Sequence, residues 1–403
     1  MNIVVQKYGG TSVSTEASRG RIADNARKLV EEGKSPVIVV SAMGRNGAPY
    51  ATDTLIGLYG DSCSVKEERD LDLMMSCGET ISAVVLSATI RQMGLEAVAL
   101  TGYQAGIMTD TAFGNANVLS VKTGRIMREL EAGKVVVVTG FQGMTEFGDI
   151  TTLGRGGSDT TAAILGEALD ASSIEIFTDV DGVMTADPRL VPSARVIDKI
   201  SYEECYQMAV DGAKVVDHKA VEVARRSGKV LKIKNTFTDA EGTTISLEAE
   251  QAPHVMKKRI ITAIASKPSV VQFTVDIDYM DPRNESFLNA FEAQEISLDL
   301  INFFENQKIF TIDAKRKDKA AGILTDLDVP FAIVEDCCKL TAVGYRIHGV
   351  PGVMKRIVLA LSKAGIEILQ SGDSHTTIAC LIRTRAQEKA MRALHAEFGL
   401  NEE

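Results

Sequence analysis

Residues 3–12, with the sequence IVVQKYGGTS, carry the pattern that decides the fold. A short β-branched run, typical of a strand, leads into Lys7, two glycines and two hydroxyl residues. The glycines let backbone N–H groups approach an oxyanion, and the hydroxyls favour the start of a helix. The stretch therefore predicts a strand, an anion-binding turn and a helix in succession.

The same alternation continues through the first half of the chain. Strand-like runs occur at 3–6, 36–42, 96–102, 135–140 and 173–180. Helical patterns occur at 16–32, 79–93, 118–132 and 159–169. Apolar strands separated by helices predict an α/β fold with a mostly parallel sheet sandwiched by helices, whose ligands lie beyond the carboxyl ends of the strands.

Near residue 248 the pattern changes to a polar, unpatterned stretch, which predicts a domain boundary. The sequence that follows predicts a small α+β unit used twice, with a strand, a Pro-containing turn, a helix and further strands in each copy. We expect a first domain over 1–248 and two ferredoxin-like α+β units over 262–335 and 336–403. One irregular α+β domain is the alternative for this region.

Composition limits the classes of protein. The 403 residues are 45% hydrophobic and 24% charged, with a formal charge of −10, which excludes disordered and collagenous chains and disfavours nucleic acid and anionic lipid as partners. The six cysteines form no C-x-x-C pair, and neither a signal pattern nor a membrane-length apolar run is evident. We expect a cytoplasmic protein with reduced thiols, no membrane association and no nucleic-acid partner.

Familiar catalytic motifs are missing. Lys28 stands where a P-loop ending at Gly33-Lys34-Ser35 needs its first glycine, and no G-x-G-x-x-G occurs. The first histidine is His218, so the preceding α/β half offers no imidazole as a base or zinc ligand. We predict no metal site made by protein side chains alone.

Three more turns carry candidate chemistry. In GRGGSDTT (154–161) the glycines precede a helix, with Ser158 as the expected N-cap and Arg155 able to fork onto a carboxylate or phosphate. In SCGE (76–79) Glu79 is expected in a first helical turn. FTDVDGV (177–183) and ADPR (186–189) provide groups that suit a ribose, phosphates and Mg²⁺. The alternatives are a tight capping loop, a surface carboxylate favoured by the helix dipole and a solvated acidic loop, respectively.

Taken together, KYGGTSV, SCGE, GRGGSDTTA, FTDVDGV and ADPR resemble the motifs of aspartate kinases, in the same order over the first 240 residues. The C-terminal pair resembles ACT domains. The resemblance implies the amino acid kinase fold, the cofactors ATP and Mg²⁺, and transfer of the γ-phosphoryl group to the β-carboxylate of L-aspartate. The product would be 4-phospho-L-aspartate, the first committed intermediate toward lysine, diaminopimelate, threonine and methionine.

The resemblance also implies roles for individual residues. The expected catalytic residues are Lys7, Asp159 and Lys214. Those expected to bind aspartate are Thr11, Ser41, Glu79, Arg155 and Ser158, with Glu79 on the ammonium and Arg155 on the α-carboxylate. Those expected to bind the nucleotide are Lys7, Gly9, Gly10, Thr178, Asp179, Arg189 and Lys214.

Two places depart from the family pattern. Asp217-His218-Lys219 replaces a common His-Pro or Ser-Pro pair, so no role is assigned to His218. Asp281-Pro282-Arg283 replaces the Pro-Gly turn of an effector-binding ACT copy, so we place the effector site in the second copy. Its expected residues are Gly352, Val353, Gln370, Ser371 and Ser374. The resemblance implies a homodimer or higher homo-oligomer that is inhibited by diaminopimelate, lysine or threonine.

Two other functions remain open from the sequence. One is a different amino acid kinase, acting on acetylglutamate, glutamate or a nucleoside monophosphate. The other is an amino acid sensor whose kinase half is inactive. We expect no fused homoserine dehydrogenase, because no second α/β domain with a dinucleotide fingerprint fits in these 403 residues.

Overall fold

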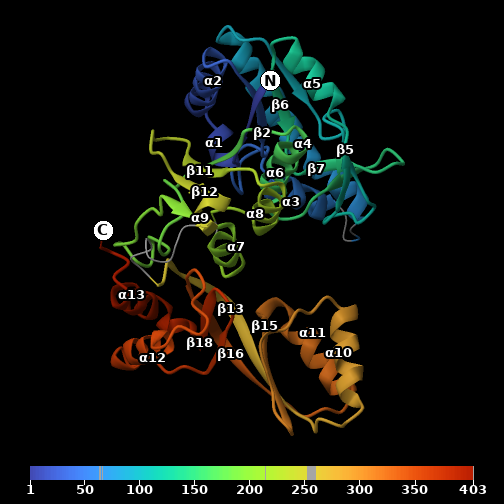
Figure 1. Ribbon diagram of the computed structural model, residues 1–403. Helices are drawn as coiled ribbons and strands as arrows, with labels where there is room; N and C mark the ends of the chain where they lie inside the picture. The colour runs from blue at the N-terminus through green and yellow to red at the C-terminus, as the bar shows by residue number, and fades with distance from the viewer. Residues whose placement is uncertain (63–64, 66, 214, 252–259, 403) are drawn as a thin grey trace. The chain divides into compact units, whose positions relative to one another are not determined.

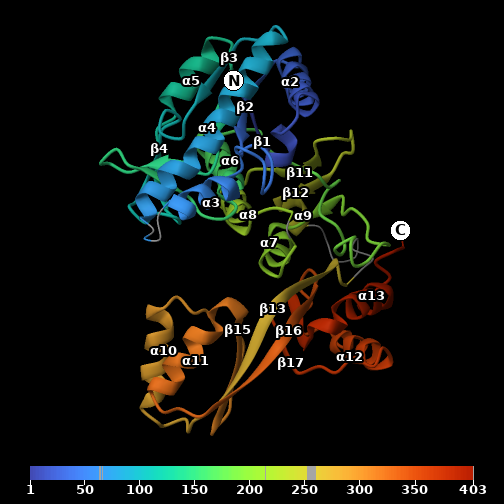
Figure 2. The same cartoon turned by 180° about the vertical axis from the view of Figure 1, so that it is seen from behind.

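The computed structural model describes residues 1–62, 65, 67–213, 215–251 and 260–402, shown from two sides in Figures 1 and 2. The chain divides into two compact units. The first comprises Met1–Val183, Val196–Ala209 and Lys214–Ala252, and the second comprises Met184–Arg195, Val210–Ala213 and Pro253–Glu403. Two short segments therefore leave the first unit, pack with the second, and return.

A mostly parallel sheet forms the middle of the first unit. Its strands, in spatial order, are β10 (Lys199–Ile200), β12 (Thr243–Ile245), β11 (Leu231–Asn235), β9 (Ser173–Thr178), β1 (Asn2–Tyr8), β2 (Lys34–Val40), β6 (Val135–Thr139) and β3 (Ala97–Leu100). Only the β11–β12 pair is antiparallel within this sheet. The expected α/β class is confirmed, and β1 lies between β9 and β2.

Helices cover both faces of this sheet (Figure 1). The helices of the unit are α1 (Gly10–Val13), α2 (Glu16–Glu31), α3 (Thr52–Ser62), α4 (Glu68–Gln92), α5 (Gly124–Glu131), α6 (Gly157–Ala168), α7 (Tyr202–Val210), α8 (His218–Ser227) and α9 (Leu247–Gln251). Ile22 of α2 and Leu86 of α4 share one buried cluster with Ile38 of β2. On the other face, Gly166 of α6 has no room for a side chain, because Ile174 lies against it.

The expected helix at 118–132 is wrong in its first third. Val118–Val121 instead forms β5, the edge strand of a four-stranded sheet with β4 (Ile107–Thr109), β7 (Gln142–Met144) and β8 (Ile150–Thr152). The run VLSV pairs with β4, so tertiary pairing overrides the helical spacing. Helix α4 also begins at Glu68, well before the expected start at 79.

Helix α4 is long and apolar enough to cross a membrane by length and composition, but half of its most apolar stretch is buried inside the unit. Core helices of soluble proteins show the same property. Of the five described cysteines, all free thiols, Cys77 is exposed and Cys205, Cys337, Cys338 and Cys380 are buried. The prediction for Cys63 falls outside the described residues.

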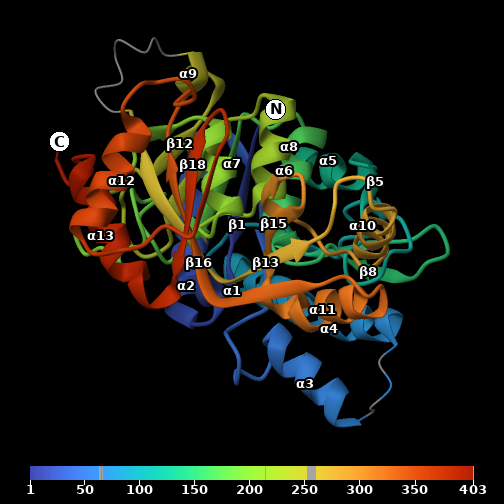
Figure 3. The same cartoon turned by 90° about the horizontal axis from the view of Figure 1, so that it is seen from below.

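The second unit is built on a single six-stranded sheet, seen from below in Figure 3. In spatial order its strands are β14 (Asp299–Phe303), β15 (Gln307–Asp313), β13 (Ala263–Asp276), β16 (Phe331–Val343), β18 (Thr377–Arg383) and β17 (Gln370–Asp373). Its helices are α10 (Arg283–Ala293), α11 (Lys317–Asp326), α12 (Val353–Lys363) and α13 (Gln387–Glu397), with 3₁₀ turns at Ala314–Arg316 and Thr384–Ala386.

The long strands β13 and β16 each belong to both ACT-like halves, which are the α+β units expected at 262–335 and 336–403. The start of β13 pairs with Lys339–Val343 of β16, and its Ile264 packs with Leu340 and with Ile357 of α12. After a register shift the same strand places Phe273 in a second cluster with Phe287 of α10. The second ACT-like half (336–403) therefore completes its part of the sheet with the start of β13, which precedes the helices of the first half in the chain. The expected boundary at 335/336 lies within β16, and the boundaries stay predictions.

This exchange of strands makes a testable prediction about fragments. A fragment of residues 336–402 lacks the strand that covers Leu340 and Ile357, so it should show no cooperative unfolding transition in urea. A fragment of residues 260–402 contains both long strands and should unfold cooperatively. Circular dichroism measures both. A sigmoidal transition of the shorter fragment would contradict the shared-strand arrangement.

Candidate active site

A buried ion pair lies beneath the turn that follows β1. Lys7 Nζ is 2.6 Å from Asp159 Oδ1, and the two side chains are 13% and 11% exposed. Lys7 leaves the carboxyl half of β1, and Asp159 lies in the first turn of α6. A charge this buried needs a partner, because removing either member leaves the other desolvated and unpaired. The structure therefore brings together two of the three expected catalytic residues.

The second oxygen of Asp159 is held by a residue that the sequence did not reveal. The backbone N–H of Asp217 donates to Asp159 Oδ2 at 3.1 Å, and the Asp217 carboxylate accepts from Lys219 N and caps α8. Gly156 makes room for this contact: with φ +75°, a Cβ there would lie 2.1 Å from Asp217 Oδ2. The available signal was an aspartate directly before a helical pattern, the residue type favoured at an N-cap.

A cavity of about 430 Å³ opens beside Gly10, in the turn that follows Lys7 and Tyr8. It is lined by Gly10, Ser41, Ala42, Gly44, Arg45, Asn46, Ala51, Thr52 and Asp53. Gly10 must be a glycine, because a Cβ there would lie 2.6 Å from the carbonyl oxygen of Ala42. The hydroxyl of Ser41 donates to that of Ser158 at 3.0 Å, which ties the cavity to the start of α6. Ser158 is not the N-cap as expected, since Gly156 occupies that position.

Glu79 lies directly behind the cavity. It lies in the middle of α4 rather than in a first turn, because Glu68–Cys77 continues the helix upstream. Its Oε1 accepts from the N–H of Ala42 at 3.0 Å, whereas Oε2 is buried without a partner in the described part of the chain. Burial raises the pKa of Glu79 to about 7. A buried carboxylate with one free oxygen is suited to receive a cationic group of a ligand.

Arg45 spans the end of β1 in this structure. Its Nη2 lies 2.7 Å from Asp179 Oδ2. Arg45 follows β2, Asp179 follows β9, and β1 lies between those strands, so the ion pair crosses above the Gly9–Gly10 turn. The hydroxyl of Thr178 contacts the same carboxylate at 3.2 Å. Sequence reasoning gave Arg45 no role, although its position between Gly44 and Gly47, both at φ +90°, marks an unusual loop after a strand.

Other expected site residues are placed less directly. Thr11 follows Gly10 in α1 and is half-buried, and Arg155 is exposed, with no hydrogen bond or ion pair to the described residues. Arg189 belongs to the second unit, where it forks onto Asp187 with contacts of 2.6 and 3.0 Å. Lys214 lies outside the described residues. The roles of these four residues stay predictions.

The expected effector residues fall into two groups within the second unit. Gly352 and Val353 line a cavity of about 300 Å³ together with Ile260, Pro351, Lys355, Arg356, Leu359, Lys363 and Glu397. Gln370 instead joins the two ACT-like halves, through its amide contacts with Gln272 and Asn302 at 2.8 and 2.6 Å. Ser371 lies beside it in β17, and Ser374 bonds to Thr377 in the following turn.

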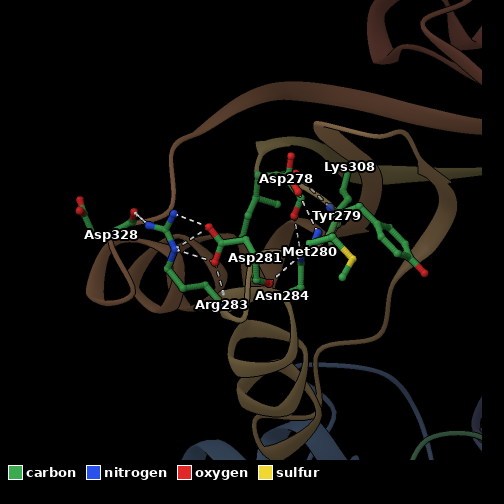
Figure 4. A network of polar contacts seen from close by, with 9 residues as sticks. Asp278, Tyr279, Met280, Asp281, Arg283, Asn284, Lys308 and Asp328 are labelled. Atoms are coloured by element: carbon green, nitrogen blue, oxygen red, sulfur yellow. Dashed lines mark hydrogen bonds and ion pairs between the residues drawn. The ribbon is translucent and has the colours of Figure 1, made fainter.

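Figure 4 shows why the first ACT-like half differs from the second. The Asp281 carboxylate accepts from the backbone N–H of Arg283 at 2.9 Å and pairs with its guanidinium at 2.7 Å, which lowers the pKa of Asp281 to about 2. Asn284 Nδ2 donates to the carbonyls of Asp278 and Asp281. Side chains of the protein thus already occupy the amides at the start of α10, where a free carboxylate would otherwise bind.

The fold and this site define an amino acid kinase. The family model of the amino acid kinase family matches residues 2–235, more than half of the chain, and an ACT domain model matches residues 332–396. The chain belongs to the aspartokinase family: aspartokinase 1 of Bacillus subtilis is 43% identical over 405 residues, covering 100% of both chains. The aspartokinase of Geobacillus stearothermophilus is 36% identical over 410 residues, covering 100% of this chain and 98% of its own.

A solved structure shows the same fold. Escherichia coli aspartokinase III in complex with aspartate and ADP superimposes with a TM-score of 0.82 at 24% identity, covering 99% of this chain and 100% of the other. The expected amino acid kinase fold followed by ACT-type α+β structure is thereby confirmed.

The raised pKa of Glu79 predicts a pH-dependent stability. The carboxyl ionises near pH 4.5 in the unfolded chain and near 7 in the folded one, so stability should fall as pH rises across this window. Glu79→Gln should leave stability unchanged near pH 4 and raise it by about 3 kcal/mol above pH 7. Urea unfolding across this range measures the difference.

Glu129→Gln is a control with the opposite sign. Lys134 lowers the pKa of the Glu129 carboxyl, so removing that charge should reduce stability at neutral pH. Equal pH profiles of the wild type and Glu79→Gln would contradict the buried, poorly solvated environment of Glu79.

Proposed function

We propose that phosphoryl transfer in this aspartate kinase takes place at the cavity beside Lys7, moving the γ-phosphoryl group of ATP to the β-carboxylate of L-aspartate to give 4-phospho-L-aspartate. The observation that carries this assignment is the buried Lys7–Asp159 pair beneath a glycine turn that opens onto the cavity. A fixed positive charge and free backbone amides at a strand end are what a transferring phosphoryl group requires.

The acceptor explains the chemistry of the site. A side-chain carboxyl with a reference pKa of about 3.9 is already ionised at neutral pH, so it attacks without a general base. Catalysis then depends on in-line positioning and on neutralising the charge of the moving group. Lys7 and Lys214 supply that charge, Gly9 and Gly10 donate amides, and Asp159 orients the two lysines.

Recognition of aspartate uses the far side of the cavity. The free Oε2 of Glu79 receives the ammonium group, and Arg155, whose guanidinium is uncommitted, clamps the α-carboxylate. Ser41, Thr11 and Ser158 provide hydroxyls around the substrate. An amino acid with one ammonium and two carboxylates matches one buried carboxylate and two cationic regions.

The nucleotide lies over the carboxyl ends of β1 and β9. Thr178, Asp179 and Arg189 hold it, and Arg45 moves from Asp179 to a phosphate when the nucleotide enters. The carboxylates of Asp179 and Asp181 would be the protein groups that help to hold Mg²⁺, an ion that prefers few protein ligands. When bound, the ion would supply charge neutralisation on the triphosphate.

The second unit regulates the first. An end product (diaminopimelate, lysine or threonine) binds near Gly352, Val353, Gln370, Ser371 and Ser374 and lowers activity in a cytoplasmic homodimer or higher homo-oligomer. Support comes from the first ACT-like half, where the Asp281 carboxylate already accepts from the amide at the start of α10, and from the cationic cavity at the start of α12. The E. coli enzyme has also been solved in complex with lysine and aspartate, and that structure superimposes with a TM-score of 0.74 at 24% identity.

Trapping the acyl phosphate with hydroxylamine tests the reaction and the site together. Wild-type protein with ATP, Mg²⁺ and L-aspartate should give β-aspartyl hydroxamate. Lys7→Ala should reduce the rate at least about a hundredfold, because it removes a preorganised charge from the phosphoryl group. Lys134→Ala, which removes a lysine paired with Glu129 far from the turn, is the control and should keep the wild-type rate.

Each result has a definite meaning. Full activity of Lys7→Ala would contradict the site. No hydroxamate from the wild type with aspartate, but signal with another acceptor, would favour a different amino acid kinase. No ATP consumption with any acceptor would favour the sensor function.

Arg45 gives a separate prediction. Its ion pair with Asp179 is exposed, so Arg45→Gln should change the melting temperature by little. The KM for ATP should nevertheless rise about tenfold, because the nucleotide loses a charge-assisted contact. Arg125→Gln removes the exposed partner of the buried Glu129, which keeps its second partner Lys134, and should leave the KM for ATP unchanged. An unchanged KM for ATP in Arg45→Gln would show that the pair has no part in nucleotide binding.

A further inference from the structure

A charged cluster lies on the central strand of the second unit. Lys339 of β16 places Nζ 2.8 Å from Asp211 Oδ1 and 2.7 Å from Asp299 Oδ2. The side chains of Lys339 and Asp211 are 11% and 3% exposed, whereas that of Asp299 is 46% exposed. Burial alone would lower the pKa of Lys339, but the two carboxylates outweigh it and raise the pKa, so the lysine stays charged.

Asp211 has an unusual place in the chain. It belongs to the segment Val210–Ala213, which packs with the second unit although the residues on either side of it belong to the first. Gly212 confirms how closely this segment is held: at φ +107°, a Cβ there would lie 2.2 Å from the carbonyl oxygen of Ser266 in β13. Two independent contacts, one charged and one steric, thus fix the segment on the sheet.

The chain continues from this segment directly into catalytic residues. Lys214 follows Ala213, and three residues further on the N–H of Asp217 holds Asp159 Oδ2. Only five residues separate Asp211 from Asp217, so a displacement of the anchored segment moves one end of the short chain that leads to the partner of Asp159. Asp299 connects the same lysine to β14, a strand of the first ACT-like half.

We propose that Lys339 is a positioning residue for phosphoryl transfer: by holding Asp211 on the six-stranded sheet of the second unit, it fixes the segment Val210–Ala213, from which the chain continues to Asp217, the residue whose N–H holds Asp159. This inference rests on the active site proposed above. It also links the six-stranded sheet to the site. A shift of β14 or β16 changes the contacts of Lys339 with its two partners and moves the anchored segment.

The test compares two buried lysines of the same sheet. Lys339→Met removes the anchor, and Lys308→Met removes a lysine that is 2% exposed, donates to the carbonyl of Ile277 and has no contact with the 210–213 segment among the described residues (Figure 4). Both variants should lose stability in urea. At a temperature where both remain folded, only Lys339→Met should lose kcat, by about tenfold to a hundredfold, which is the scale of a misplaced catalytic group.

A double-mutant cycle separates positioning from general damage. Asp211→Asn should lower kcat in the same way as Lys339→Met, and the double variant should be no worse than Lys339→Met alone, because both remove one interaction. Lys339→Arg keeps the charge and should recover most of the rate. The KM for aspartate should change less than kcat in all of them, since the cavity itself is untouched.

Several results would overturn the inference. They are a wild-type kcat in Lys339→Met, an equal loss of kcat in Lys308→Met, or independent, additive losses in the Lys339→Met and Asp211→Asn cycle. Failure of the proposed function is recognised separately, because it would appear as missing hydroxamate in the wild type.

Discussion

The buried contact between Lys7 and Asp159 is the constraint on which the active site depends. Two charges this poorly hydrated need each other as partners, and the carboxylate must be brought from a helix that begins far along the chain. The unusual backbone features around this pair follow from that requirement. Gly156 turns left-handed so that Asp217 can approach, and the Asp217 amide then binds the oxygen of Asp159 that Lys7 leaves free.

Charge explains how an acidic protein binds anionic substrates. The chain carries a formal charge of −10, so its long-range field does not attract ATP or aspartate. Attraction must come from local cations and amides at the strand ends. In the active site proposed above, Glu79 works in the opposite direction: burial raises its pKa to about 7, so an ammonium group placed beside it favours the ionised form of the carboxyl.

Local patterns predicted what local forces determine. The strand at 3–6 and the turn Gly9–Gly10 were readable, because a β-branched run and adjacent glycines each act within a few residues. Arg45, Asp217 and the contact of Glu79 with Ala42 were not, since each depends on a partner distant in the sequence. The helical spacing at 118–132 misleads in its first residues for the same reason: the pairing of Val118–Val121 with β4 is a tertiary contact. The sharing of β13 was not predictable either, because it depends on pairing with β16, which extends from the first expected α+β unit into the second.

One continuous sheet carries both ACT-like halves, and that has a mechanical consequence. The helices α10 and α12 pack on different stretches of the same strands, so a ligand near either helix acts on β13 and β16. Close-packed strands shift as units rather than deform gradually. Because Ser266 of β13 and Lys339 of β16 both hold the 210–213 segment, movement of the sheet cannot leave that segment in place. In the inference drawn above, this anchored segment is the link from the second unit toward Asp159, because the same chain continues to Asp217.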